Sequence, residues 1–124
     1  MNLPENLKYA KSHEWVKDLG KGLFEIGLSD YAQKELGDIV FVNLPQAGDS
    51  LEAGKSFGDV ESVKAVSDII SPVAGKVTEA NETVLSAPES INKAPYETWL
   101  IRAAGTLPEG KLFSAGEYQA SLMG

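Results

Sequence analysis

Short runs of apolar residues, several of them alternating with polar ones, recur along the chain, and turn-forming residues separate these runs. The runs lie at residues 13–18, 23–29, 38–45, 56–63, 68–81 and 98–103. Runs that are bounded by glycine, proline or asparagine and are too short for buried helices are typical of β-strands. The pattern therefore predicts a mainly β protein.

Short helices are expected to interrupt these strands. At residues 30–36, the spacing of Asp30 and Gln33 is typical of a capping box, and Gly37 favours a helix end with a left-handed residue. A single helical turn is expected at residues 88–91. The first of these elements carries both a start and a stop signal, so we expect a well-defined short helix there.

A further helix is expected near the C-terminal end. Ser114 and Glu117 have the spacing of a second capping box. The residues that follow supply an apolar face, which consists of Tyr118, Leu122 and Met123. This pattern predicts a C-terminal helix that packs on the sheet.

Length and composition indicate one folded domain. The chain has 124 residues, of which 43% are hydrophobic and 23% are charged. This length is enough for one hydrophobic core but not for two, so we expect a single domain that covers residues 1–124. No apolar stretch is long enough to span a bilayer, and the first residues lack the apolar segment of a signal peptide. We therefore expect a cytoplasmic protein.

Charge and the absence of cysteine narrow the function further. Eighteen acidic residues against 11 basic ones give a formal net charge of −7. This charge repels phosphate backbones and anionic membrane surfaces, so we expect neither nucleic acid nor a membrane as a partner. Without cysteine the chain has no disulfide, no thiolate nucleophile and no thiolate metal site.

Two short patterns resemble catalytic motifs but lack residues that the chemistry requires. The residues Gly54-Lys55-Ser56 resemble the end of a phosphate-binding loop, but the upstream glycine position is occupied by Asp49. His13-Glu14 resembles the start of a zinc-protease helix, but the chain has only one histidine. No serine lies in a nucleophile elbow. We therefore expect no metal site and no catalysis by the protein alone.

Lys64 lies where the run at 56–63 and the next run are expected to fold back on each other as a hairpin. Most hairpin lysines are ordinary surface charges. Here, however, the neighbours Val63 and Ala65 are poor residues for a tight turn, which usually contains Asn-Gly or Asp-Gly. An exposed amine between small apolar residues on rigid strands leaves room for a modifying enzyme to reach it. The arrangement indicates a covalent attachment site.

The segment around Lys64 resembles the lipoylation hairpin of the glycine cleavage H-protein family. The residues that carry the resemblance are Glu61-Ser62-Val63-Lys64-Ala65, followed by Ser67-Asp68 and Ser71-Pro72-Val73-x-Gly75. Other pieces match in order and spacing, among them Ser12-His13-Glu14-Trp15, Leu36-Gly37-Asp38 and Ile91-Asn92. Biotinyl domains carry Met-Lys-Met and the lipoyl domains of ketoacid dehydrogenases usually carry Asp-Lys-Ala, and neither is present. The chain departs from the family pattern in having two residues between Tyr96 and Trp99 instead of three.

This resemblance implies a fold and a cofactor. The fold is a lipoyl/biotinyl-like β-sandwich, also called a barrel-sandwich hybrid, with two antiparallel sheets and short helices that include the C-terminal one. The cofactor is lipoate in amide linkage to Lys64. The residues that the lipoate-attaching enzymes would recognise are Glu61, Ser62, Val63 and Ala65.

The resemblance also implies a role as a monomeric carrier that catalyses nothing itself. Its lipoyl arm would shuttle the aminomethyl group from glycine decarboxylase (P protein) to aminomethyltransferase (T protein), and dihydrolipoamide dehydrogenase (L protein) would reoxidise it. The loaded arm would carry a small cation that loses its amine in water and needs a sheltered cleft. We expect Glu14 and Asp68 to face this cation, with Ser12 and Glu61 as further candidates.

Several alternatives stay open at this stage. Glu14 and Asp68 are equally well explained as exposed solubilising acids, while His13 and Trp15 would pack on a neighbouring strand and Trp99 in the core. The protein could donate lipoyl groups onward to other enzymes as a relay. It could also be an enzyme that uses a buried Lys64 as a Schiff-base nucleophile, or a plain β-sandwich adaptor.

Overall fold

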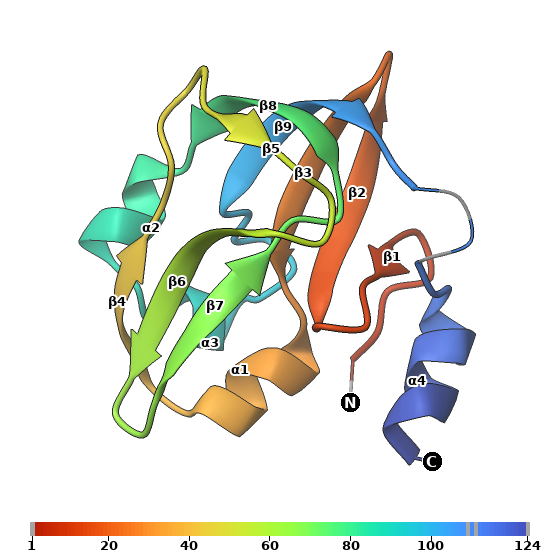
Figure 1. The fold of residues 1–124 in the computed structure, drawn as a ribbon. Helices are drawn as coiled ribbons and strands as arrows, with labels where there is room; N and C mark the ends of the chain where they lie inside the picture. The colour runs from red at the N-terminus through yellow and green to blue at the C-terminus, as the bar shows by residue number, and fades with distance from the viewer. Residues whose placement is uncertain (1, 109, 111, 124) are drawn as a thin grey trace.

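The computed structural model describes residues 2–108, 110 and 112–123, and two antiparallel sheets dominate it (Figure 1). One sheet has six strands in the order β1-β2-β3-β9-β8-β5, and the other has three in the order β4-β6-β7. The strands are β1 Lys8–Tyr9, β2 Glu14–Gly20, β3 Leu23–Leu28, β4 Ile39–Asn43, β5 Ser50–Leu51, β6 Ser56–Ser62, β7 Val66–Ile70, β8 Ala74–Ala80 and β9 Ile101–Thr106. The prediction of a mainly β, two-sheet fold is confirmed, and neither sheet closes into a barrel in the described part of the chain.

All six predicted runs contain strands, but the run at 68–81 was too long to be one. It holds the end of β7 and the whole of β8, which belong to different sheets. Pro72 lies between them, where it cannot donate a ladder hydrogen bond. The strands β1 and β5 have two residues each, which is too short for a recognisable hydrophobic alternation.

Four helices accompany the sheets in the described residues. They are α1 Asp30–Leu36, α2 Glu82–Ser86, α3 Ser90–Lys93 and α4 Ala115–Met123. The bounds of α1 match the prediction, but its N-cap is Ser29, whose hydroxyl accepts a hydrogen bond from the Ala32 N–H. Asp30 is the first helical residue instead, and its carboxylate accepts a bond from the side chain of Gln33. The single turn expected at 88–91 is α3, two residues further on, whereas α2 was not predicted.

The C-terminal helix α4 packs against β1, and its capping box is present as predicted. The Ser114 N–H donates to Glu117 Oε1 over 2.8 Å, and the Glu117 N–H donates to Ser114 Oγ over 3.2 Å. Tyr118 is fully buried and stacks on Tyr9 with ring centroids 4.8 Å apart. Met123 is 81% exposed, so its predicted place on the packing face is wrong.

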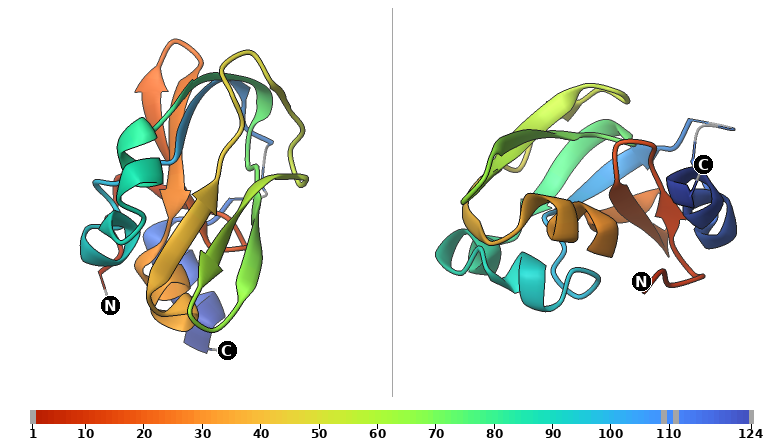
Figure 2. Two further views of the ribbon diagram at one scale, coloured as in Figure 1. Left: turned by 90° about the vertical axis from the view of Figure 1, so that its left-hand side faces the viewer. Right: turned by 90° about the horizontal axis from the view of Figure 1, so that it is seen from below.

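The core lies between the two sheets and beneath the short helices. Figure 2 shows α2 and α3 together on one side of the sandwich and α4 outside the six-stranded sheet. The small sheet contributes Val42, Val60 and Ile69 to the central cluster, which also includes Ala32 of α1 and Ile91 of α3. Burial of this apolar surface holds α1 close to the β6–β7 hairpin.

Candidate functional site

Lys64 lies at the tip of the hairpin formed by β6 and β7, and its side chain is exposed. Next to the turn, Val60 pairs with Ser67 and Glu61 pairs with Val66, so the two strands stay in register up to the tip. The hairpin inferred from the sequence is therefore present (Figure 1), and Lys64 lies in the turn between its two strands. This exposure does not meet the requirement of the Schiff-base alternative, which needs a buried lysine.

The hydroxyl of Ser62 holds the hairpin tip in shape. Its Oγ accepts hydrogen bonds from the N–H groups of Lys64, at 3.1 Å, and Ala65, at 3.0 Å. The Ser62 N–H in turn donates to the Ala65 carbonyl over 2.8 Å. Within the described residues, only His13 and Lys21 combine a side chain with a positive φ, so the tip contains no left-handed residue. A side-chain acceptor thus replaces the Asn-Gly type of turn, which explains why Val63 and Ala65 are tolerated there.

The tip rests on the junction between α1 and β4. The Val63 N–H donates to the Asp38 carbonyl over 3.0 Å. The Cε atom of Lys64 would lie 3.5 Å from a Cβ atom placed on Gly37, which has a φ of 78°. Glycine is therefore suited to this position by its positive φ, whereas the distance to the lysine side chain is that of an ordinary van der Waals contact.

Asn92 of α3 fixes this junction from the other side. Its Oδ1 accepts a bond from the Ile39 N–H over 2.9 Å. Its Nδ2 donates to the Gly37 carbonyl over 2.9 Å and to Gln33 Oε1 over 3.0 Å. Asn92 was noticed in the sequence only as part of the resemblance, because nothing in its local pattern indicates contacts with residues more than fifty positions away.

A cavity of about 130 Å³ lies between β7, α1 and the start of β2, and it brings together the three residues predicted to dock the arm. Ser12, Glu14 and Asp68 all line it, and so do apolar side chains such as Leu28 and Leu36. Glu61 does not line this cavity. The sequence therefore predicted a cluster that the fold does assemble from separate elements.

Glu14 is buried at this cavity with only 1% of its surface exposed. One carboxylate oxygen accepts a hydrogen bond from the Ser12 hydroxyl, and the other accepts one from the Ile70 N–H over 3.0 Å. Burial raises the pKa of Glu14 from its ordinary value of 4.5 to about 7, and these hydrogen bonds oppose the rise. The alternative that Glu14 is an exposed solubilising acid is wrong.

Asp68 is exposed, so it lies on the solvent side of the cavity. It pairs across the ladder with Asp59, whose carboxylate accepts a bond from the Asn43 amide. None of the ion pairs in the described part of the chain includes Asp68. Two carboxylates opposite each other repel, so this end of the cavity favours a cation.

His13 and Trp15, on either side of Glu14, have structural contacts of their own. His13 Nδ1 lies 2.7 Å from the Tyr118 hydroxyl, and Trp15 is fully buried with its Nε1 donating to the Pro95 carbonyl. The expected packing on a neighbouring strand is confirmed for Trp15, which lies against Gly27 of β3. It is wrong for His13, whose ring packs against Tyr31 of α1 and Tyr118 of α4. Trp99, expected in the core, is only half-buried and lies under the guanidinium of Arg102 at 4.2 Å.

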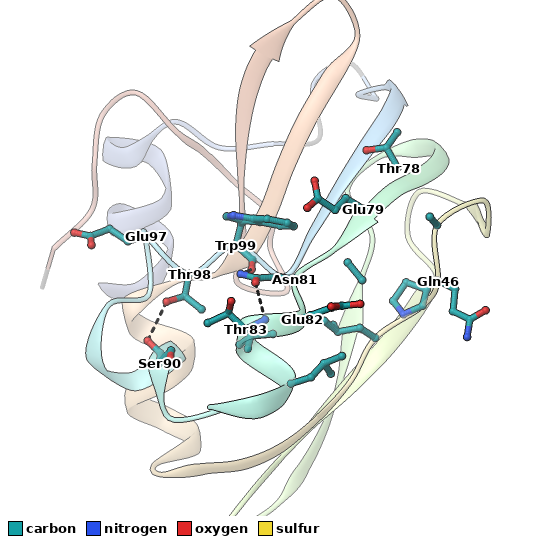
Figure 3. A pocket seen from close by; sticks show the side chains of 16 residues that line it. Gln46, Thr78, Glu79, Asn81, Glu82, Thr83, Ser90, Glu97, Thr98 and Trp99 are labelled. Carbon is teal, nitrogen blue, oxygen red and sulfur yellow. Dashed lines mark hydrogen bonds between the residues drawn. The ribbon is translucent and has the colours of Figure 1, made fainter.

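A hollow larger than this cavity lies elsewhere, between β8, α2 and residues 97–99 (Figure 3). It has a volume of about 1080 Å³, and none of the predicted site residues lines it. Polar groups on its wall bond to one another, as in the bonds from Thr98 to Ser90 and from the Thr83 N–H to Asn81 drawn in Figure 3. The residues that the structure describes contain no group of three side chains suited to a metal ion, and none of their helices has the length and apolar character to cross a membrane.

A two-sheet β fold with a lysine at the tip of a rigid hairpin defines the class of lipoyl-type carrier domains. Comparisons with known proteins identify the family within this class. The family model described as "Glycine cleavage H-protein" matches residues 7–123, and the chain belongs to this family.

Individual relatives agree with this assignment. The glycine cleavage system H protein of Lachnoclostridium phytofermentans is 50% identical over 119 residues, which cover 96% of this chain and 94% of the relative. That of Halalkalibacterium halodurans is 50% identical over 121 residues, covering 95% and 94%. The crystal structure of the H protein from Mycobacterium marinum has a TM-score of 0.90 with 36% identity, and the match covers 97% of this chain and 98% of that one.

Proposed function

We propose that this protein is the lipoyl carrier of a glycine cleavage system, with lipoate in amide linkage to Nζ of Lys64. The observation that carries the proposal is the exposed lysine at a hairpin tip held by Ser62 and anchored to Asp38. Membership of the glycine cleavage H-protein family supports it. The carrier catalyses nothing itself.

Attachment is an acyl transfer to the lysine nitrogen. Nζ attacks the carbonyl carbon of lipoate activated as an acyl adenylate, the new C–N bond forms, and the bond from that carbon to the phosphate oxygen breaks to release AMP. The nitrogen, which begins as an ammonium, gives up two protons to the solvent, so one positive charge is lost from the surface. The exposure of Lys64 suits this step, since the attacking amine needs no rearrangement of the hairpin.

When attached, the lipoyl group supplies the disulfide that takes up the aminomethyl group of glycine. The residues of this chain then shelter the cationic cargo. Lys64 and Asp68 are four positions apart, or about 13 Å of extended strand, so the arm has to fold back along β7 to reach the cavity. Asp68 at the exposed side places negative charge near the ammonium, and a cation docked in the cavity would favour the ionised form of Glu14 at the buried side. The Ser12 hydroxyl adds a polar contact.

The cavity also limits access of water to the cargo. Its walls include Leu28 and Leu36, and the small volume leaves little room beside a docked arm. The chain contains no cysteine, so no internal thiolate can attack the disulfide of the arm by exchange.

The partners of this cycle are glycine decarboxylase, aminomethyltransferase and dihydrolipoamide dehydrogenase. One carrier has to visit each of them, so the complexes are transient. The net charge of −7 steers the carrier toward basic surfaces on these enzymes and makes association weaken with salt.

Intact-protein mass spectrometry tests the attachment. After incubation with a lipoate–protein ligase, lipoate and ATP, we expect a mass increase of one lipoyl group that maps to Lys64 and is absent from Lys64→Arg. The exposed lysine of another turn provides the control, since Lys55→Arg should be modified like the wild type. Modification at a different lysine, or none at Lys64, would overturn the proposal.

Reconstitution separates a carrier of glycine cleavage from a relay. The lipoylated protein should support glycine decarboxylation with the three partner enzymes, whereas a pure relay would not. In the same system Glu14→Gln should speed the loss of ammonia from the loaded carrier by about tenfold. This factor corresponds to the loss of about 1.4 kcal/mol of electrostatic stabilisation of the bound ammonium. Glu52→Gln, an exposed acid outside the cavity, serves as the matched control.

A further inference from the structure

His13 is a strained residue at the wall of the cavity that Ser12, Glu14 and Asp68 line. Its φ of 81° lies in the left-handed region, which glycine adopts freely and residues with a side chain rarely adopt. Residues held in such conformations cluster at functional sites. The backbone therefore carries a cost that a glycine would remove, which indicates that the imidazole has a use at this wall.

Two buried hydroxyl groups determine which ring nitrogen of His13 carries the proton. The Tyr118 hydroxyl lies 2.9 Å from Ser29 Oγ and 2.7 Å from His13 Nδ1. Ser29 and Tyr118 are both fully buried, and Ser29 Oγ already accepts a bond from the Ala32 N–H. In the described residues the Ser29 hydroxyl has no other acceptor than the Tyr118 oxygen. Ser29 therefore donates to Tyr118 and Tyr118 donates to Nδ1, because the reverse order leaves a buried O–H without a partner.

With Nδ1 as an acceptor, the proton of the neutral imidazole is on Nε2. Nε2 has no hydrogen-bond partner in the described part of the chain, where every buried side-chain nitrogen and oxygen has one. Its N–H is therefore an accessible donor. The ring packs on Tyr31 of α1 with centroids 4.8 Å apart, and Glu35, one turn further along α1, lines the cavity as well. The donor thus lies beside the helix that forms one wall of the cavity.

The same network keeps the imidazole uncharged. Burial lowers the pKa of His13, and the nearby carboxylate of Glu35 opposes this change only in part. Protonation of Nδ1 would also force Tyr118 to turn its proton toward Ser29, whose own proton would then lose its acceptor. An imidazolium at this wall would repel an ammonium cargo, whereas the neutral ring does not.

We propose that His13 is a binding residue for the docked arm, whose Nε2–H donates a hydrogen bond to the sulfur that carries the aminomethyl group. The inference rests on the proposed attachment of lipoate to Lys64 and adds a contact to it. The ammonium has only donors, and the carboxyl groups of Glu14 and Asp68 serve it. A neutral N–H has to serve an acceptor instead, and the acceptors at the cargo end of the arm are its sulfur atoms.

This hydrogen bond slows the loss of the cargo. Ammonia leaves when the C–N bond breaks with its electron pair on nitrogen, while a sulfur lone pair forms a double bond to carbon and takes over the positive charge. Water then adds to that carbon and loses a proton, and the C–S bond breaks to give formaldehyde and a thiol. A hydrogen-bond donor beside the atom on which positive charge develops raises the barrier of the first step. His13 therefore protects the cargo in addition to the exclusion of water.

NMR spectroscopy of the ring nitrogens tests the tautomer in the unmodified protein. At neutral pH we expect the proton of His13 on Nε2, whereas Tyr118→Phe, which removes the donor to Nδ1, should populate the other tautomer. After attachment of lipoate and loading with glycine and glycine decarboxylase, the Nε2–H proton should shift downfield and exchange more slowly with water. A proton on Nδ1 in the wild type, or no change on loading, would overturn the inference.

The rate of ammonia loss from the loaded carrier tests the role of the donor. His13→Asn is a suitable variant, because asparagine tolerates a positive φ and has an acceptor for Tyr118 but no group in place of Nε2. We expect about three- to tenfold faster loss, which corresponds to one missing hydrogen bond. Lys21→Asn is the matched control, since Lys21 also has a positive φ, of 57°, but lies between β2 and β3 outside the cavity. It should lose ammonia at the rate of the wild type.

The outcomes separate this inference from the proposed function. If the wild type takes up no lipoyl group at Lys64 or cannot be loaded, the proposed function fails and the inference fails with it. If the wild type is loaded and folded His13→Asn loses ammonia equally fast, only the inference is overturned. Faster loss in Lys21→Asn also overturns it, since a change of backbone strain and not the missing donor would then be the cause.

Discussion

The Nδ1 atom of His13 lies 2.7 Å from the hydroxyl oxygen of Tyr118, and this contact joins the C-terminal helix to the turn that precedes β2. His13 has a φ of 81°, and its backbone N–H and carbonyl are bonded to Ala10 and Ser29. The Tyr118 hydroxyl also lies 2.9 Å from Ser29 Oγ. Since Glu14 directly follows this turn, α4 supports the backbone that carries the buried carboxyl.

Tyr118→Phe should lower the free energy of unfolding by about 1–2 kcal/mol, because it removes two buried hydrogen-bond contacts and keeps the stacking on Tyr9. Urea unfolding measures this change. A double-mutant cycle with His13→Gly, which keeps the positive φ without strain, isolates the contact between the two side chains. Strictly additive effects of the two substitutions would show that this contact contributes nothing.

Ser62→Ala should loosen the hairpin tip, since the N–H groups of Lys64 and Ala65 lose their common acceptor. We expect faster amide hydrogen exchange at these two residues and a loss of about 1 kcal/mol in unfolding free energy. Ser62→Thr retains the hydroxyl and should keep the protection. Unchanged exchange in Ser62→Ala would mean that the strands alone define the tip.

Asn92→Ala should destabilise the fold by about 2 kcal/mol or more, because it removes the partner of the Ile39 N–H, the Gly37 carbonyl and Gln33 Oε1. Chemical denaturation provides the measurement. Asn43→Ala is the control, since Asn43 is exposed and makes one side-chain bond, to Asp59, so its loss should cost about 0.5 kcal/mol or less. Equal effects of both variants would contradict the anchoring role of Asn92.

The raised pKa of Glu14 predicts a pH-dependent stability. The folded protein holds this proton up to about pH 7, whereas the unfolded chain releases it near the ordinary pKa of 4.5. The unfolded state therefore gains by ionising first, and stability falls as the pH rises from about 4.5 to 7, by roughly 3 kcal/mol for this group alone.

Comparison of the wild type with Glu14→Gln between pH 4.5 and 7.5 measures this contribution. As the pH rises, the unfolding free energy of the wild type should fall relative to that of Glu14→Gln, because glutamine does not titrate. The matched control is Glu52→Gln, which changes an exposed carboxylate by the same atoms and should follow the wild type. A constant difference between the wild type and Glu14→Gln over this range would show that Glu14 titrates normally.

The sequence was most informative where local chemistry decides the structure. The longer strands, the bounds of α1 and the capping box of Ser114 and Glu117 follow from nearby residues, and all are present. The N-cap of α1 was wrong by one residue, because Ser29 and Asp30 are both good caps and the contact of Ser29 with Tyr118 is a tertiary one. Local patterns do not contain that information.

The candidate site shows the same limit. Lys64 could be placed at a hairpin tip from the two flanking runs, but the burial of Glu14 could not, because it depends on the edge of β7 and on α1 closing over the start of β2. The bulge at Val40 also escaped notice, since the run of apolar residues in β4 reads as one regular strand. Register between strands distant in sequence decides which of these side chains face the solvent.

β7 is an outer strand of its sheet, and the Ile70 N–H points away from its ladder partner toward Glu14 Oε2 at 3.0 Å. Open backbone donors on outer strands invite pairing with foreign chains, which leads to aggregation. A side chain from the opposite sheet occupies this donor, so the carboxyl that faces the cavity also protects the margin of the hairpin sheet. Loss of Glu14 would therefore endanger solubility as well as function.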